Sequence, residues 1–183
     1  GRKENNPLPS KEDNWIIRDI MVKCVFQHAS EKDLKVIRAL YADAIGSPGC
    51  TWDEGYPDAE CTRADWARGD LYCIKTETGE IIGAVSIDAD EIVEKLPCWT
   101  ITLQPGAELA RLVVKETYQN QGIAKQLLQC GMNELAKRGY QSVHFLVSKT
   151  NERALRAYEP LGFENRGEWF GYEHDWWCYE KAL

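Results

Sequence analysis

Residues 118–128, YQNQGIAKQLL, have the types and spacing that point most directly to chemistry. They follow an apolar run, LARLVV, that is typical of a strand, and they start a helical pattern. A helix N-terminus carries unpaired N–H groups and the positive end of the helix dipole. Gly122 lacks a Cβ, Ala124 has the smallest one, and Lys125 adds a cation. A turn of such small residues can bring successive N–H groups onto a phosphate, so this stretch could hold a pyrophosphate mainly through its backbone.

Two familiar phosphate-binding loops are excluded. The chain has no GxxxxGK[ST] segment, and it has no GxGxxG segment followed by an acidic residue. Taken alone, Gly122 also has a purely geometric explanation, because a tight strand-to-helix turn often needs a residue without a side chain.

Three segments together give this turn a more specific meaning. Residues 119–124, QNQGIA, match the pattern [QR]-x-x-G-x-[GA], and residues 151–163 contain N-x-x-A-x-x-x-Y-x-x-x-G-F. Residues 108–114, ELARLVV, lie upstream as a strand. In this order and at this spacing, the segments resemble the acetyl-CoA-binding region of the GNAT superfamily of N-acetyltransferases. The order of elements from Met21 onward also agrees, so the resemblance covers nearly the whole chain after residue 19.

The resemblance implies acetyl-CoA as the cosubstrate, with no metal. The turn would hold its pyrophosphate, and the strand before it would offer backbone N–H groups to the thioester carbonyl and to pantetheine. Asn151 would cap the next helix and contact the cofactor. The expected cofactor-binding residues are Leu112, Val113, Val114, Gln119, Asn120, Gln121, Gly122, Ile123, Ala124, Lys125, Asn151 and Tyr158.

Acetyl transfer to an amine requires the neutral amine. A lysine-like amine has a pKa of about 10.4, so only about one molecule in 10³ is neutral near pH 7, and a general base is useful. Glu108, at the start of the strand, is the candidate base by its position, acting through water. An equally good explanation is structural: the carboxylate of Glu108 would organise the end of the strand and take no part in catalysis. Glu80, Glu164 and Glu168 are the alternative bases.

The leaving thiolate needs a proton, and Tyr158 occupies the position that the family uses for this general acid. Pro160 lies near the end of the same helix, and we expect the helix to end or tighten there. Cys130 and Cys178 lack the His and Asn partners of a cysteine nucleophile, which favours direct attack by the amine over a covalent enzyme intermediate.

The acceptor side is indicated by a loop, CTWDEGYPDAE, that combines aromatic and carboxylate side chains. Such side chains suit an ammonium ion. The candidate acceptor-binding residues are Trp52, Asp53, Glu54 and Tyr56. Residues 168–177, EWFGYEHDWW, have the same character. The alternative is that these aromatics pack against the sheet and the charges are solvated. We expect a small primary amine as the acceptor, and a cationic amine would suit these side chains.

Two other functions stay open. A protein or peptide N-acetyltransferase would need an open groove, and a non-catalytic CoA-binding sensor would need no acid or base. The presence of Gly122, Asn151 and Tyr158 together favours catalysis. The resemblance is also compatible with a homodimer.

Composition limits the partners and the compartment. The net charge of −7 argues against nucleic acid, whose phosphates require clustered Lys and Arg. No apolar run approaches the roughly 20 residues of a membrane span, and no signal-peptide pattern is visible. The seven scattered cysteines show neither zinc-ligand spacing nor a CxxC pair, and they favour the reducing cytoplasm. They are Cys24, Cys50, Cys61, Cys73, Cys98, Cys130 and Cys178.

The remaining pattern predicts the elements that must position these residues. Strands are expected over 20–30, 107–115 and 142–148, in a hairpin over 70–88, and in two closing strands around Gly167 or Gly171. Helices are expected over 31–45, 62–69, 123–138 and 152–161, whereas 89–106 is ambiguous.

The expected fold class is mixed α/β, the GNAT fold, with a central mixed and mostly antiparallel sheet flanked by helices. Residues 1–19 are expected to be a flexible N-terminal extension or a cloning remnant. Residues 20–183 are expected to form a single GNAT acetyltransferase domain.

Overall fold

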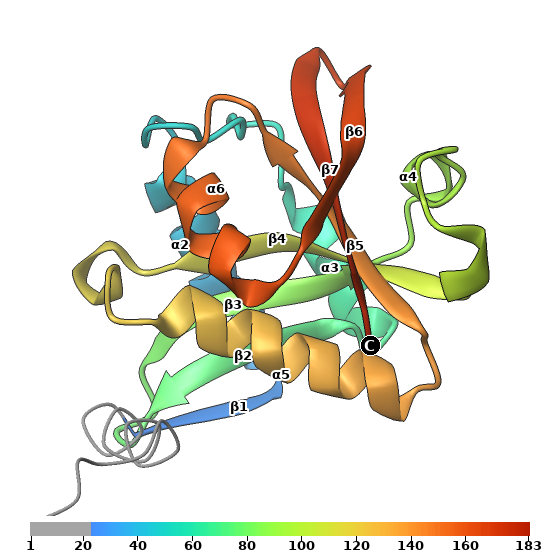
Figure 1. Ribbon diagram of the computed structural model, residues 1–183. Helices are drawn as coiled ribbons and strands as arrows, with labels where there is room; N and C mark the ends of the chain where they lie inside the picture. The colour runs from blue at the N-terminus through green and yellow to red at the C-terminus, as the bar shows by residue number, and fades with distance from the viewer. Residues whose placement is uncertain (1–22) are drawn as a thin grey trace, which may run out of the picture.

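The computed structural model describes residues 23–183, so the expected extension over 1–19 lies outside the described residues. Seven strands form one sheet in the order β1-β2-β3-β4-β5-β7-β6 (Figure 1). Every neighbouring pair is antiparallel except β4 and β5, which are parallel. The expected mixed, mostly antiparallel sheet flanked by helices is therefore confirmed. Within 23–183, no helix is both long and apolar enough to cross a membrane.

The elements follow the sequence pattern closely. The strands are β1 (Cys24–His28), β2 (Leu71–Thr76), β3 (Ile81–Asp88), β4 (Gly106–Val114), β5 (Ser142–Ser148), β6 (Glu164–Gly171) and β7 (His174–Ala182). The α-helices are α2 (Leu34–Ala44), α3 (Ala59–Ala67), α4 (Glu91–Glu94), α5 (Ile123–Lys137) and α6 (Glu152–Tyr158). Short 3₁₀ turns are η1 (Glu31–Asp33), η2 (Ile101–Leu103), η3 (Glu116–Tyr118) and η4 (Glu159–Leu161).

Local hydrogen bonds explain where the boundaries differ from the expected ones. The helix expected over 62–69 begins at Ala59, because the carboxylate of Asp58 accepts from the N–H of Cys61 at 2.8 Å and caps it. The first turn of the helix expected over 31–45 is 3₁₀. The ambiguous segment 89–106 holds the short α4 and η2. The expectation for Pro160 is confirmed, since α6 ends at Tyr158 and continues only as 3₁₀.

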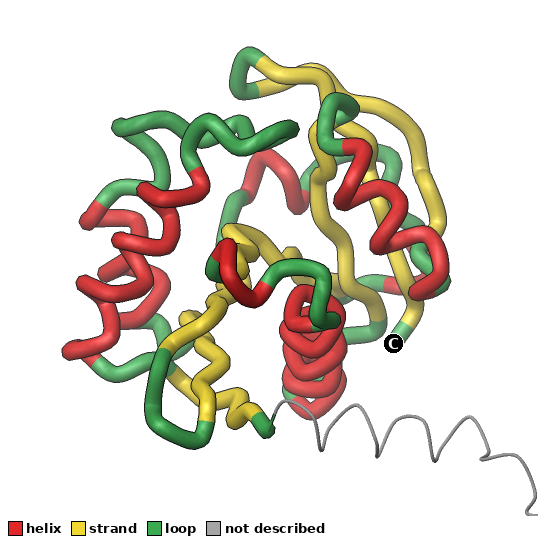
Figure 2. The backbone as a smooth tube through the Cα atoms, turned by 90° about the vertical axis from the view of Figure 1, so that its left-hand side faces the viewer, coloured by secondary structure: helices red, strands yellow, loops and turns green. Residues whose placement is uncertain are grey.

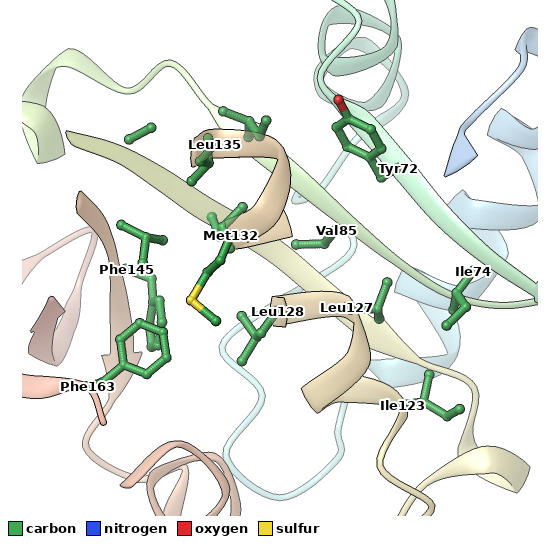
Figure 3. Close-up of a cluster of buried hydrophobic side chains, with 14 of the residues drawn as sticks. Tyr72, Ile74, Val85, Ile123, Leu127, Leu128, Met132, Leu135, Phe145 and Phe163 are labelled. Carbon is green, nitrogen blue, oxygen red and sulfur yellow. The ribbon is translucent and has the colours of Figure 1, made fainter. Parts of the chain in front are cut away.

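Helices cover both faces of the sheet. α5 packs against β3, β4 and β5 on one face, and α2 and α3 pack on the other, as Figures 1 and 2 show. The larger core lies under α5 and is filled by side chains of α5, the sheet and the segment after α6 (Figure 3). α5 packs closely on the sheet at Gly131, where an added Cβ would be only 3.1 Å from Leu109 Cδ1. The smaller core under α2 includes Ile37, Tyr41 and Val113.

A bulge in β4 changes which face its side chains meet. Ala84 pairs with Val113 but Ser86 pairs with Ala110, so β4 has one more residue than β3 across this step. Arg111 lies in the bulge with a φ of 49°, in the left-handed region that residues other than glycine rarely adopt. Leu109 and Val113 would share a face in a regular strand. Because of the bulge, Leu109 packs under α5 whereas Val113 packs under α2.

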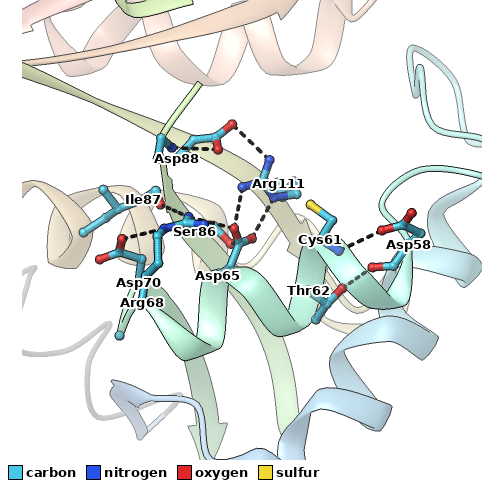
Figure 4. Close-up of polar contacts among 12 residues, drawn as sticks. Asp58, Cys61, Thr62, Asp65, Arg68, Asp70, Ser86, Ile87, Asp88 and Arg111 are labelled. Atoms are coloured by element: carbon cyan, nitrogen blue, oxygen red, sulfur yellow. Dashed lines mark hydrogen bonds and ion pairs between the residues drawn. The ribbon is translucent and has the colours of Figure 1, made fainter. Parts of the chain in front are cut away.

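The buried side chain of Arg111 holds this bulge to α3 (Figure 4). Its guanidinium donates to both carboxylate oxygens of Asp65, from Nε at 2.8 Å and from Nη2 at 2.9 Å. Nη1 donates to Asp88 Oδ2 at 3.0 Å and to the hydroxyl of Tyr56 at 3.0 Å. The side chains of Arg111 and Asp65 are only 4% and 2% exposed, so each charge depends on the other. Ser86 also donates to Asp65, at 2.7 Å.

Replacing Arg111 with methionine should cost about 3–5 kcal/mol of unfolding free energy, because the carboxylate of Asp65 would stay buried without its cation. Denaturant unfolding followed by circular dichroism would measure this loss. Arg63→Gln is the matched control, since Arg63 and its partner Glu31 are 59% and 65% exposed. The control should stay within about 0.5 kcal/mol of the parent. Equal stability of the two variants would contradict this account of the bulge.

Candidate active site

A large cleft opens where β4 and β5 separate. The two strands pair only from Gly106 to Glu108 against Ser142 to His144, and beyond this they have no ladder. The cleft has a volume of about 1560 Å³ and reaches from the turn before α5 to the end of β3. Of the sequence-predicted residues it is lined by Trp52, Asp53, Tyr56, Glu108, Leu112, Val113, Val114, Gln119, Asn120, Gly122, Ile123, Ala124, Lys125, Asn151 and Tyr158. The structure therefore brings together residues from four separate parts of the chain.

The turn before α5 presents the start of this helix to one end of the cleft. Gly122 is the N-cap residue, with a φ of 80°, a conformation that glycine adopts without strain. A Cβ built on Gly122 would meet nothing within 4 Å, so the turn is open at this point. Ile123 anchors the first turn of α5 in the core with 1% of its surface exposed. The first residues of α5 line the cleft, and the N–H groups of a helix N-terminus are those that an anion site requires.

Side-chain amides support the turn from within. The amide of Gln119 donates to the carbonyl of Val114 at 3.3 Å, and the amide of Gln121 donates to the carbonyl of Thr117 at 3.3 Å. Gln121 is exposed and does not line the cleft, so the structure does not support its side chain as a cofactor contact. Asn120 has a φ of 61°, so the turn contains a second left-handed residue.

Helix α6 carries Asn151 and Tyr158 along the same end of the cleft. The side chain of Asn151 accepts from the N–H of Ala154 at 3.1 Å, which confirms its predicted role as a cap. Gly49 lies so close that a Cβ there would be 2.6 Å from the Cα of Asn151, which packs the loop after α2 against α6. The ring of Tyr158 meets Phe145 edge-on at 5.1 Å. Burial raises the pKa of the Tyr158 hydroxyl to about 12.

Glu108 lies at the other end of the cleft. Its side chain is 5% exposed, and Oε1 has no hydrogen-bond partner among the described residues. Burial, together with the nearby carboxylates of Asp88 and Asp90, raises the pKa of Glu108 well above its usual range. Its strand neighbours Ala107 and Leu109 pack under α5, so Glu108 projects toward the opposite face of the sheet.

The three alternative bases lie outside the cleft. Glu80 is occupied, since it accepts from Lys115 at 2.5 Å and from the hydroxyl of Tyr118 at 3.1 Å. Glu164 and Glu168 lie on β6, where they pair with Arg166 and Lys149 respectively. Glu108 is the one sequence-predicted base that lines the cleft.

The loop after α2 forms one wall near Glu108. Trp52 packs edge-on against Tyr41 at 5.3 Å, and the hydroxyl of Tyr56 accepts from Arg111. Asp53 stabilises the loop itself, because its Oδ1 accepts from the N–H of Gly55 at 2.8 Å. Glu54 is exposed and outside the cleft. Of the expected acceptor set, Trp52, Asp53 and Tyr56 therefore line the cleft and Glu54 does not, while Asp53 is partly used by its own turn.

The hairpin between β6 and β7 forms the facing wall. The hydroxyl of Tyr172 donates to Asp90 Oδ2 at 2.5 Å, which joins the hairpin tip to the segment after β3. The indole N–H of Trp176 donates to the carbonyl of Gly171 at 2.8 Å and fixes the turn. The aromatic and acidic side chains of residues 168–177 had already indicated this hairpin as a candidate acceptor wall in the sequence. Asp88, Asp90 and Arg111 carried no such local signal, because only the folded sheet brings them to the cleft.

The described residues show no group of three or more His, Cys, Asp or Glu side chains that could hold a metal ion. All seven cysteines are free thiols.

Comparison with known proteins agrees with the geometry. A [ribosomal protein bS18]-alanine N-acetyltransferase from Haemophilus ducreyi is 29% identical over 98 residues, which are 54% of this chain and 65% of that protein. The chain thus spans just under two thirds of this relative's length. A GNAT acetyltransferase structure from Listeria monocytogenes aligns with a TM-score of 0.71 and 19% identity, over 87% of this chain and 95% of that one.

The Salmonella typhimurium protein yncA, whose structure contains its cofactor acetyl-CoA, aligns with a TM-score of 0.67 and 18% identity over 87% of this chain and 94% of that one. At such identities the two structures show a shared fold. The sequence model of the acetyltransferase (GNAT) family matches residues 37–163, which include the strand bulge, the turn before α5 and helix α6. The chain therefore belongs to the acetyltransferase (GNAT) family.

Proposed function

We propose that this protein is an N-acetyltransferase that moves an acetyl group from acetyl-CoA to a small, cationic primary amine. The observation that carries the proposal is the cleft through the split sheet, whose two ends differ in charge. The N-terminus of α5 and the side chain of Arg153 lie at one end. Glu108, Asp88 and Asp90 line the other, where Arg111 balances the charge of Asp88. An anionic cosubstrate and a cationic acceptor can thus approach one another from opposite faces of the sheet.

The residues at the turn fit acetyl-CoA. Gly122 and the first N–H groups of α5 offer a place for a pyrophosphate, and Arg153 adds positive charge beside them. Members of the family use acetyl-CoA, which supplies an acetyl thioester when bound. Leu112, Val113 and Val114 line the cleft where β4 has left β5. Their backbone is suited to hold the thioester carbonyl and to stabilise the oxyanion that forms there.

Glu108 is the proposed general base. An ammonium group at this end of the cleft would lose its proton to Glu108 through a water molecule. Because the pKa of Glu108 is raised above the usual range of a carboxyl, it lies closer to neutral pH, and a general base is most effective when its pKa is near the working pH. Tyr158 is the proposed acid for the leaving thiolate, and with a pKa of about 12 its hydroxyl stays protonated at neutral pH.

The acceptor end supports a small cation for two reasons. Burial would raise the pKa of Asp88, but the hydrogen bond and charge of Arg111 keep it below its usual value, so Asp88 remains ionised. The aromatic rings of Trp52, Tyr56 and Tyr172 lie around the same end and can pack against an alkylammonium ion. The hydrogen bond from Tyr172 to Asp90 joins two walls that line this end of the cleft, which favours a compact acceptor over an extended chain.

A protein α-amine is the second candidate acceptor. Relatives that share parts of this sequence are named as acetyltransferases of an alanine of ribosomal protein bS18. A peptide N-terminus is also a primary amine and could use the same base and acid. It would have to enter beside the bond between Tyr172 and Asp90. A homodimer stays a prediction.

Replacing Gly122 with alanine should weaken acetyl-CoA binding about tenfold or more, because the new Cβ would project into the space for the pyrophosphate and the left-handed backbone would be strained. Isothermal titration would measure it. Gly139→Ala is the matched control: Gly139 has a φ of 89°, follows the other end of α5, and also has open space around its Cβ position. The control should lose similar stability and bind acetyl-CoA like the parent. Equal weakening in both variants would place the effect in strain alone.

Replacing Glu108 with glutamine should change both activity and stability with pH. The raised pKa of Glu108 means that the folded protein binds a proton that the unfolded chain releases. Its contribution to stability is therefore fully present below the ordinary glutamate pKa of about 4.3, and it is lost as the pH rises through the raised pKa of the folded protein. Glu108→Gln should be more stable than the parent at pH 8, and its kcat should fall about a hundredfold or more.

The pH profile separates catalysis from a structural role for Glu108. The parent should show a rising limb in kcat/KM as Glu108 ionises, and this limb should be missing in Glu108→Gln. A variant that keeps the limb and the parent kcat would remove Glu108 as the base. Thermal unfolding between pH 5 and pH 9 would test the stability part independently of turnover.

The proposed function is tested by thiol release from acetyl-CoA across an amine panel. Small diamines and aminoalkyl cations should be better acceptors than neutral amines of the same length, and better than peptides that begin with alanine. Preferred turnover of the peptides would establish the second candidate instead. Tyr158→Phe should bind acetyl-CoA but lose turnover about a hundredfold or more. Tyr179→Phe, which alters another ring that packs against Phe145, should keep the parent turnover. Binding without turnover by the parent on every amine would indicate a sensor.

A further inference from the structure

One arginine joins the two motifs that line the cofactor end of the cleft. Arg153, in the first turn of α6, donates from Nη1 to Gln119 Oε1 at 2.7 Å and from Nη2 to Asn120 Oδ1 at 2.9 Å. A planar guanidinium with two parallel donors holds two acceptors in one fixed geometry, which a lysine cannot do. The fork therefore links two consecutive residues of the turn before α5 to another helix.

The contact restrains the part of the turn that is costly to form. Asn120 has a φ of 61°, and Gly122, two residues later, has a φ of 80°. Asparagine tolerates the left-handed region better than most residues, but it still prefers extended backbone. A side-chain hydrogen bond at Asn120 keeps the chain in this conformation, and this conformation exposes the N–H groups of the helix start.

The charge of Arg153 is not cancelled by its partners. Both acceptors are neutral amides, and no carboxylate pairs with Arg153 within residues 23–183. Arg68, Arg111 and Arg138 instead each pair with an aspartate. Arg153 itself lines the cleft. Its positive charge is thus available to an anion that binds at the turn.

We propose that Arg153 is the positioning residue of the cofactor site: it holds residues 119–122 in the pyrophosphate-binding conformation and fixes this turn to the helix that carries Tyr158. The inference rests on the proposed use of acetyl-CoA. α6 bears Asn151 at its N-terminus and Tyr158 at its end, so one fork sets the place of the pyrophosphate relative to the general acid.

The decisive variant is Arg153→Gln, with Arg156→Gln as the matched control. Arg156 is on the same helix, its side chain is 75% exposed, and its partner Glu152 lies 4.0 Å away. Arg156 also lines the cleft but contacts neither Gln119 nor Asn120, so its variant controls for the loss of one cation. By isothermal titration, Arg153→Gln should bind acetyl-CoA about tenfold more weakly than the parent, and several-fold more weakly than Arg156→Gln. Parent affinity in Arg153→Gln, or an affinity equal to that of Arg156→Gln, would overturn the proposal.

Arg153→Lys separates the fork from the charge. Lysine keeps the cation but cannot hold both amides, so this variant should bind acetyl-CoA with an affinity between those of the parent and Arg153→Gln. Full parent affinity in Arg153→Lys would reduce the role to charge and overturn the positioning claim.

Hydrogen exchange in the acetyl-CoA-free protein gives a readout that does not depend on the proposed function. The amides of Gln119 and Gln126, which donate to the carbonyls of Glu116 and Gly122 on either side of the turn, should exchange about tenfold faster in Arg153→Gln, and at the parent rate in Arg156→Gln. Faster exchange in a protein that binds no acetyl-CoA would uphold the positioning role of Arg153 and refute the proposed acetyltransferase function. Unchanged exchange in Arg153→Gln would overturn the positioning role of Arg153, even if the parent turns over acetyl-CoA.

Discussion

The ion pair between Arg111 and Asp65 is the interaction on which the cleft depends. A non-glycine residue in the left-handed region is costly, and the extra residue in β4 persists because a buried, bidentate pair ties it to α3. The bulge moves Val113 from the α5 face to the α2 face, and the pairing of β4 with β5 ends before it, at Glu108. The same guanidinium reaches Asp88 and Tyr56, so the strand geometry and the acceptor wall are set by one side chain.

The rest of the site is built around this split in the sheet. α5 is anchored by a continuous apolar face, and it meets the cleft with its N-terminal residues and Leu128. α6 lies beside it, with one contact to the loop after α2 at Gly49 and another to the turn through Arg153. The positive end of the cleft thus comes from the N-terminus of α5 and from Arg153, and the other end is lined by carboxylates at strand ends together with Arg111.

The sequence allowed the helices, the strands and most of the cofactor end to be predicted, because these depend on local patterns. The turn QNQGIA, the cap at Asn151 and the break at Pro160 all act within a few residues of themselves. The bulge could not be predicted, because Arg111 in LARLVV reads as one polar residue in an apolar strand. Its partners lie 46 and 23 residues away, and only tertiary contacts make its backbone conformation favourable.

Glu54 and Gln121 were expected at the site from the sequence, but they do not line the cleft. Both have suitable chemistry next to residues that line the cleft, but a neighbour in a turn can point either way. The direction of a loop side chain is set by hydrogen bonds such as those of Asp53 with Gly55 and of Gln121 with Thr117. A list of residue types in a loop does not contain this information.

The position of β7 has a consequence for how the protein is made. β7 lies between β5 and β6, and within residues 23–183 β6 pairs with no other strand. During synthesis β6 therefore leaves the ribosome before its place in the sheet exists, and it can dock only as one arm of the hairpin with β7. The wall that bears Tyr172 is the last part to assemble, so a nascent chain can complete the cofactor end while its acceptor end is still open.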